Sequence, residues 1–355
     1  MADGAVKFLS SSVLLANNFN PKIYLQQTIK LRGQSKIWIV LIVLWLINGS
    51  SFLAIKISID TIPPLLSAGI RFLIAGSALY SIYLVQPLLR RNKKNQKQEI
   101  HAHIGKREWR DAIILGGLLM VGGQGILTWG SQYLPSGITG LLNSTVPLWI
   151  AILALVIFRR RLSHLTIAGL CAGFGGLMLL VAPSLSTGEL SPIGTTALIL
   201  SSVLWALGSL YSTKSKLPVS ILASSGMIMI TGGLMLTFIS LSLGEYRGLE
   251  LSDISWQSTM ALIYLILIVT VVGFTDFYWL LRVTTPSLAN TFAYVSPVIA
   301  VILGWALLHE SITSITVVAM IVILMGVALM VTKPHKRKRM DIKSTDHHPA
   351  GTTSP

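Results

Sequence analysis

Two ionisable side chains stand inside long apolar runs of this sequence, and both have chemistry that suits binding or moving a solute. Asp276 lies late in the run 258–281, and Arg71 lies early in the run 65–85. A charge inside hydrocarbon is costly, so residues of this kind are candidates for function. Asp276 could bind a cationic substrate or carry a proton, or it could instead pair with Arg282. Arg71 could attract an anionic substrate, or it could serve as an anchor that faces other helices.

Two prolines, Pro147 and Pro297, stand in the middle of apolar runs and suggest where a cavity lies. Proline removes one backbone hydrogen bond and frees the carbonyl four residues earlier. Freed backbone groups at membrane depth are tolerated inside protein or beside a wet cavity. A kink that serves packing alone is the alternative. Because a pocket needs a few polar groups among apolar walls, we predict that one substrate site is lined by Asn48, Arg71, Gln124, Asn143, Pro147, Trp205, Asp276, Tyr294 and Pro297.

The composition requires lipid as the solvent for most side chains. Of the 355 residues, 52 % are apolar and only 12 % are charged, and the mean hydropathy is +0.70. The charged fraction is about half the usual value of about 25 %. The net charge of +15 could suggest nucleic-acid binding. However, the basic residues stand in loops and tails between apolar runs, where membrane topology explains them better, so we predict no nucleic-acid partner.

Ten apolar runs are long enough to cross a membrane, since a helical span needs about 20 residues. They predict an all-α integral membrane protein. The spans are 37–55, 65–85, 112–132, 137–158, 165–182, 193–213, 219–243, 258–281, 287–308 and 313–331. Within the fifth, Gly169 and Gly173 have the spacing that permits close packing against another helix.

The basic residues predict the orientation of these spans. With a cytoplasmic N-terminus, 25 of the 28 Lys and Arg residues fall in cytoplasmic segments. The outer loops hold only Lys56 and Arg247, and Arg71 falls within a span. This bias follows the positive-inside rule for an even number of spans. We therefore predict a multi-pass protein of the plasma or inner membrane with both termini in the cytoplasm.

An internal repeat divides the chain into two halves at an offset of 150 residues. The matches in register include Gly123 with Gly273, Trp129 with Trp279, Pro147 with Pro297 and Gly176 with Gly326. Each half contains five spans, and an odd number requires the second half to be inverted, as in many secondary transporters. The predicted domains are a cytoplasmic arm (1–36), two five-helix repeats (37–182 and 193–332) and a basic, disordered cytoplasmic tail (333–355).

Several segments resemble EamA-type transporters of the drug/metabolite transporter superfamily, and most closely the YedA-type exporters. The stretch 279–297, with Gly304 and Glu310 after it, resembles the second half of that family, and 45–56 resembles the start of the first half. The resemblance implies ten helices, a central cavity and the movement of small metabolites or drugs, usually outward. The sequence departs from the family's pattern at Arg160, where the family often has glutamate, and at Asp276.

The sequence lacks the residue patterns of an enzyme. It contains no P-loop motif, its seven histidines fall in loops or tails, and its one cysteine, Cys171, has no partner. We therefore predict no catalytic residues, no metal and no cofactor, with proton coupling as an open question. The predicted function is secondary transport by alternating access, with the export of small metabolites or drug-like compounds such as amino acids. The partners are then the solute and the lipid bilayer. A polytopic membrane enzyme or a non-transporting scaffold is the alternative.

Overall fold

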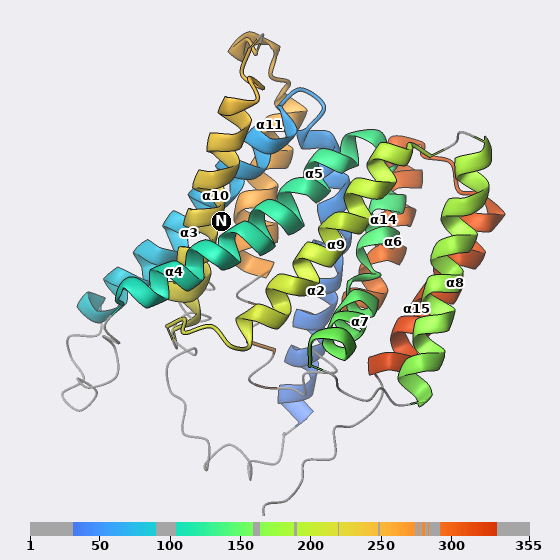
Figure 1. The fold of residues 1–355 in the computed structure, drawn as a ribbon. Coiled ribbons are helices and arrows are strands. Elements are labelled where there is room, and N and C mark those ends of the chain that lie inside the picture. Colours follow the sequence, from blue (N-terminus) through green and yellow to red (C-terminus); the bar gives the residue numbers. More distant parts are fainter. Residues whose placement is uncertain are drawn as a thin grey trace, which may run out of the picture.

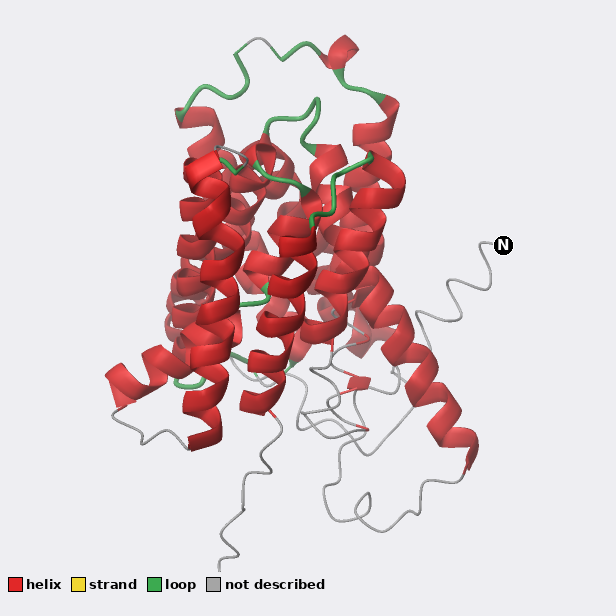
Figure 2. Ribbon diagram, turned by 90° about the vertical axis from the view of Figure 1, so that its right-hand side faces the viewer, coloured by secondary structure: helices red, strands yellow, loops and turns green. Residues whose placement is uncertain are grey.

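The computed structural model describes residues 31–89, 104–158, 164–187, 190–218, 220–247, 249–273, 276, 279, 280, 283 and 292–331. Throughout this part of the chain the regular structure is helical, with no strand. Figure 1 shows the helices side by side in one bundle, and Figure 2 shows the loops gathered at the ends of the helices. The prediction of an all-α fold is confirmed for the described residues.

The first ten helical segments cover the first half of the chain and, with the tenth, the start of the second half. In order they are α2 (Leu31–Ser58), α3 (Pro64–Leu89), α4 (Lys106–Leu115), the π-helical η1 (Gly116–Gly125), α5 (Ile126–Gly130), the 3₁₀ turn η2 (Ser131–Tyr133), α6 (Ser136–Asn143), α7 (Val146–Phe158), α8 (His164–Thr187) and α9 (Pro192–Ser212). The remaining segments are α10 (Ile221–Ser242), the 3₁₀ turn η3 (Leu251–Asp253), α11 (Trp256–Tyr264), the π-helical η4 (Leu265–Val272), α14 (Phe292–Leu308) and α15 (Ser314–Val331).

Among the described residues, six helical stretches are long and apolar enough to cross a membrane: Lys36–Ser58, Pro64–Gln86, Lys106–Tyr133, Ser136–Ile157, Pro192–Ser212 and Ile221–Ser242. Four shorter apolar helices lie at His164–Leu179, Trp256–Val272, Val295–Leu308 and Ser314–Leu329, where the sequence predicts the other four spans. Large apolar side chains also cover the outside of the bundle, and Phe238 and Ile39 are 71 % and 60 % exposed. Such a surface suits lipid rather than water. The chain is therefore a multi-pass membrane protein.

Two helix pairs hold the bundle together, and each joins one half of the chain to the other. The first is α3 with α10. A Cβ on Gly76 would lie 2.8 Å from the backbone nitrogen of Ile230, and one on Gly233 would lie 2.7 Å from the backbone nitrogen of Leu73. Glycine at these positions lets the two backbones touch, which is how helices pack closely in membranes.

The second pair is α8 with α15, at the edge of the bundle in Figure 1. A Cβ on Gly326 of α15 would lie 2.5 Å from the backbone nitrogen of Gly173 and 2.7 Å from the carbonyl oxygen of Gly169. The predicted close packing of these two glycines of α8 is therefore confirmed. Below them, Leu148 packs with Ile323 and Val327.

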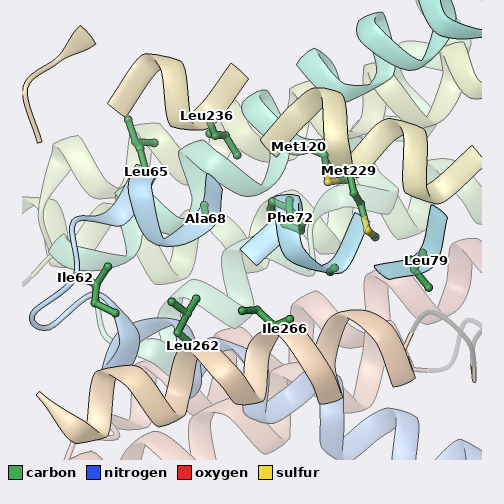
Figure 3. Packing of buried hydrophobic residues seen from close by; sticks show 11 residues of the cluster. Ile62, Leu65, Ala68, Phe72, Leu79, Met120, Met229, Leu236, Leu262 and Ile266 are labelled. Atoms are coloured by element: carbon green, nitrogen blue, oxygen red, sulfur yellow. The ribbon is translucent and has the colours of Figure 1, made fainter. Parts of the chain in front are cut away.

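The largest buried cluster lies where α3 and α10 meet the two π-helical segments (Figure 3). Phe72 and Leu79 of α3 pack there with Met120 of η1, Met229 of α10 and Ile266 of η4. Both η1 and η4 begin within one residue of the 150-residue offset that relates the two halves. A π-helical segment is rare and widens the helix locally, often at a functional site.

Two helix boundaries differ from the sequence-based prediction. The first helix begins at Leu31, inside the segment predicted as a cytoplasmic arm, so it extends beyond the apolar run. The fourth predicted span consists of two helices, α6 and α7, which are separated at Ser144 and Thr145. The Ser144 hydroxyl donates to the Leu141 carbonyl at 2.7 Å and the Thr145 hydroxyl to the Leu142 carbonyl at 2.6 Å. These hydroxyls satisfy carbonyls at the end of α6, which makes the break compatible with membrane depth.

Candidate functional site

Arg71 of α3 is a buried cation that reaches the π-helical segment η4. Its side chain is 6 % exposed, and its Nε donates to Thr270 Oγ1 at 2.9 Å. The Thr270 hydroxyl donates in turn to the Leu265 carbonyl, five residues earlier, at 2.8 Å. Within the described residues, the other four N–H groups of the guanidinium make no hydrogen bond. Arg71 thus joins α3 to η4 and still has donors for an anionic group.

Asp276 is a buried acidic residue on the same predicted span as Thr270. It is 6 % exposed, and within the described ranges it makes no hydrogen bond. The one ion pair among the described residues joins Arg110 to Asp111, so neither Asp276 nor Arg71 has an ionic partner there. Arg282, the alternative partner that the sequence suggested for Asp276, lies outside the described residues. A buried charge without a partner is costly, which supports a ligand or a proton as its complement.

Three of the predicted site residues gather around α9. A Cβ on Gly123 would lie 2.6 Å from Cε3 of Trp205, so the indole ring lies directly against η1 beside Gln124. One turn earlier on α9, the Ser202 hydroxyl reaches the Leu142 carbonyl at 3.5 Å, next to Asn143. Gln124, Asn143 and Trp205 are half-buried, and the amides of Gln124 and Asn143 make no hydrogen bond within the described chain. These amides therefore stay candidates for binding a polar solute. Pro147 lies close by, as the second residue of α7.

The other predicted residues gather around α2. The Nδ2 of Asn48 donates to the Leu44 carbonyl at 2.9 Å. The next residue, Gly49, touches α14: a Cβ there would lie 3.0 Å from the carbonyl oxygen of Ser296. Pro297 is buried inside α14. Tyr294 lies in the same helix, and its side chain is outside the described part.

Sequence reasoning missed Ser296 and Thr270 as members of this site. The Ser296 hydroxyl is buried and has no hydrogen-bond partner in the described part of the chain. It stands immediately before Pro297 and against α2. The sequence feature that could have identified Ser296 is its position next to a proline in an apolar run. Thr270 carried no signal, because its partner Arg71 is 199 residues away.

Glu310 and Lys56 bind backbone groups at the end of the bundle where α2 ends and α6 begins. We call the contacts of these two side chains the clasp. The Ser136 backbone nitrogen donates to Glu310 Oε1 at 2.6 Å, and the Ser136 hydroxyl and Gly137 nitrogen donate to Oε2 at 3.0 and 3.2 Å. The Lys56 ammonium donates to the carbonyls of Ser131, Gln132 and Leu134 at 2.9, 3.1 and 2.9 Å. A carboxylate thus caps the N-terminus of α6, and an ammonium binds the carbonyls at the end of η2, as helix dipoles favour.

Two further carboxylates join distant parts of the chain. Glu245 accepts from the backbone nitrogen of Leu66 at 3.1 Å and from the Ser240 hydroxyl at 2.8 Å, at the N-terminus of α3. Asp111 accepts from the Tyr211 hydroxyl at 3.1 Å and from the backbone nitrogen of Lys216 at 2.7 Å. These contacts give Glu310, Glu245 and Asp111 structural roles, and Asp276 has no such contact within the described residues.

An open groove of about 530 Å³ lies between α5 and α9. Its lining is apolar and includes Ile126, Trp129 and Leu200, and none of the nine predicted residues belongs to it. The described residues also contain no group of three His, Cys, Asp or Glu side chains that could hold a metal ion. The polar groups around α2 and α9, with Arg71 and Asp276, therefore remain the candidate site.

Both halves of the sequence match one known protein family. The sequence profile of the EamA-like transporter family matches residues 36–182 and matches a second time at residues 192–332. The chain belongs to this family. The resemblance noted from the sequence is confirmed, and so is the presence of two copies of one domain.

Several relatives of this EamA-like protein are named as uncharacterized transporters. The uncharacterized inner membrane transporter YedA of Escherichia coli K12 is 31 % identical over 292 residues, covering 82 % of this chain and 89 % of YedA. The uncharacterized transporter YoaV of Bacillus subtilis is 25 % identical over 304 residues, covering 85 % and 99 %. A solved crystal structure matches with a TM-score of 0.55 at 16 % identity, covering 83 % of this chain and 97 % of the other, which supports the fold alone. The family and these relatives are transporters and not enzymes.

Proposed function

We propose that this protein is a secondary transporter that moves small metabolites or drug-like compounds outward across a cell membrane by alternating access. Its ten spans form two inverted halves of five, and both termini lie in the cytoplasm. The solute binds near the middle of the bundle, between the groups of polar residues around α2 and α9. No cofactor takes part, and a proton gradient is the candidate driving force.

The observation that best supports this proposal is that helix contacts made by the first half have equivalents made by the second half. In this scheme α2 and α9 are spans one and six, and each packs on a span of the opposite half: α2 on α14, and α9 on α6 and α7. The η4 segment packs on α2 and α3, just as η1 packs on α9 and α10. A pseudo-two-fold axis in the membrane plane relates such pairs, and rocking of one half against the other gives alternating access.

The proposed orientation of the protein in the membrane rests on the distribution of its basic residues. The basic residues of the sequence collect at one side of the proposed membrane, as the positive-inside rule requires. With this orientation the clasp of Glu310 and Lys56 lies at the outer end of the bundle. It joins α14 of the second half to α6 of the first, so an outward-open state requires these contacts to separate.

A solute screen in proteoliposomes tests the proposal. The purified protein is reconstituted, and labelled amino acids, amines and amphipathic drugs are tested for flux with and without an imposed pH gradient. We expect saturable flux of at least one solute class. Trp205→Leu should lower the flux because the ring lies in the proposed site, whereas Trp256→Leu should leave it unchanged because Trp256 is 71 % exposed at the start of α11. Absence of flux for every class, under either condition, would favour a scaffold.

A further inference from the structure

We propose that Asp276, Trp279 and Trp45 form a binding site for an organic cation, meaning an ammonium group carried on an apolar body. This inference rests on the proposed transport function and specifies the substrate class of the same site. Three features carry it: the isolation of the carboxylate, its position against α2, and the aromatic rings that pack on the neighbouring apolar cluster.

The carboxylate of Asp276 lacks the partners that other acidic groups have. Glu310, Glu245 and Asp111 each accept two or more hydrogen bonds from backbone or side-chain donors. Asp276 accepts no hydrogen bond in the described part of the chain, although the residue is buried, with only 6 % of its surface exposed. Burial of an ionised carboxylate is tolerated when a cation or a set of donors compensates it. The structure of the described chain supplies neither, so a bound cation is the missing complement.

Asp276 faces α2. Gly273, three residues earlier, touches that helix, since a Cβ on it would lie 3.3 Å from Ile47 Cγ2. Leu280, four residues later, is fully buried in a cluster with Leu41 and Leu44 of α2. Residues three and four apart lie on one face of a helix. The carboxylate therefore lies between these two contacts, at the level of Leu44 and Ile47.

Aromatic side chains pack on the apolar cluster next to this position. Trp279, three residues after Asp276, and Trp45 of α2 are half-buried and pack on the cluster of Leu41, Leu44 and Leu280, as does Phe292. An aromatic face attracts ammonium groups through its quadrupole, and tryptophan does so most strongly. A carboxylate beside indole rings and an apolar cluster thus suits a cation with an apolar body better than an anion or a neutral sugar.

The other buried charge does not neutralise Asp276. Arg71 donates to Thr270, six residues before Asp276. At 1.5 Å per residue these positions are about 9 Å apart along a helix. No ion pair between Arg71 and Asp276 exists within 4.0 Å. The cation site and the arginine are therefore separate features of the bundle.

Calorimetric titration of the full-length protein in detergent micelles tests the inference. The probe is benzyltrimethylammonium, whose charge is permanent, and phenylacetate and benzyl alcohol are its anionic and neutral counterparts. We expect saturable binding of the cation alone. Asp276→Asn should weaken that binding at least tenfold, and Trp279→Leu should weaken it roughly threefold to tenfold through loss of the cation–aromatic contact. Asp276→Glu should retain it. The matched control Asp253→Asn, at an exposed turn, should bind as the unchanged protein does.

Three results would overturn the cation site: wild-type protein that does not bind the probe, equal binding of all three probes, or an Asp276→Asn variant within twofold of wild type. Size-exclusion chromatography of each variant confirms that it is folded. The flux screen separates this inference from the proposed function. Flux of an anionic or neutral solute, unaffected by Asp276→Asn, would refute the cation site and leave the transporter in place.

Discussion

Replacing Glu310 by alanine should destabilise the protein by loosening the attachment of α14 to α6. The carboxylate accepts from the backbone nitrogens of Ser136 and Gly137 and from the Ser136 hydroxyl. The backbone at the site is arranged for this contact, because His309 adopts a left-handed conformation with φ 54° and the Glu310 nitrogen donates to the Gly304 carbonyl at 3.1 Å. A left-handed non-glycine residue is uncommon, so tertiary contacts must hold it there.

The magnitude follows from these three hydrogen bonds. Loss of a helix N-cap costs about 0.5–2 kcal/mol, and hydrogen bonds to a charged group contribute about 1.5–3 kcal/mol each without adding fully. Because Glu310 is half-buried, we expect about 2–3 kcal/mol for Glu310→Ala. Glu310→Gln keeps one acceptor oxygen and loses the charge, so its cost should be about 1 kcal/mol.

Unfolding in mixed micelles with increasing sodium dodecyl sulfate, followed by far-ultraviolet circular dichroism, gives the free-energy difference. Glu250→Ala is the matched control, since Glu250 is exposed and has one long contact of 3.5 Å with Ser252. It should change stability by less than about 0.5 kcal/mol. Equal stability of Glu310→Ala and Glu250→Ala would refute the clasp as a stabilising contact.

Three other substitutions test separate contacts by the same unfolding measurement. Lys56→Met should lower the free energy of unfolding by about 1–2 kcal/mol, because three carbonyls lose an ammonium donor. An unchanged free energy of unfolding would show that water replaces the ammonium group. Gly326→Leu should separate α15 from α8 and lower the free energy of unfolding by about 1–3 kcal/mol or more through overpacking, and a variant as stable as the unchanged protein would contradict the contact. Thr270→Val should raise the tendency of Arg71 to leave its site and lower solute flux, with a cost of about 1–3 kcal/mol for the unpaired donor; unchanged stability and flux would argue against this bond.

The sequence predicted the features that depend on local composition and periodicity. Apolar runs located the helices, and the spacing of Gly169 and Gly173 predicted a close helix contact, which the structure shows to be with α15. The 150-residue offset predicted that the two halves are related, and the family profile matches each half once. These signals are strong because lipid allows few alternatives to an apolar helix.

The sequence could not predict contacts between residues that are far apart in the chain. Glu310 caps a helix that begins 174 residues earlier, and Arg71 meets Thr270 across 199 residues. No periodicity records such a pairing, because it depends on how helices pack. The π-helical segments were also missed, since the residues of η1 and η4 read as ordinary apolar helix. Asp276 and Arg71 were found because a charge within an apolar run is itself a signal.

Counterflow in proteoliposomes tests the central proposal of alternating access most directly. Vesicles are loaded with an excess of the unlabelled solute identified by the screen, and the entry of labelled solute from outside is followed. A carrier whose site faces one side at a time should show transient accumulation of label above the outside concentration, and this should be absent in unloaded vesicles. Label that equilibrates without accumulation, at a rate independent of the internal solute, would contradict the account.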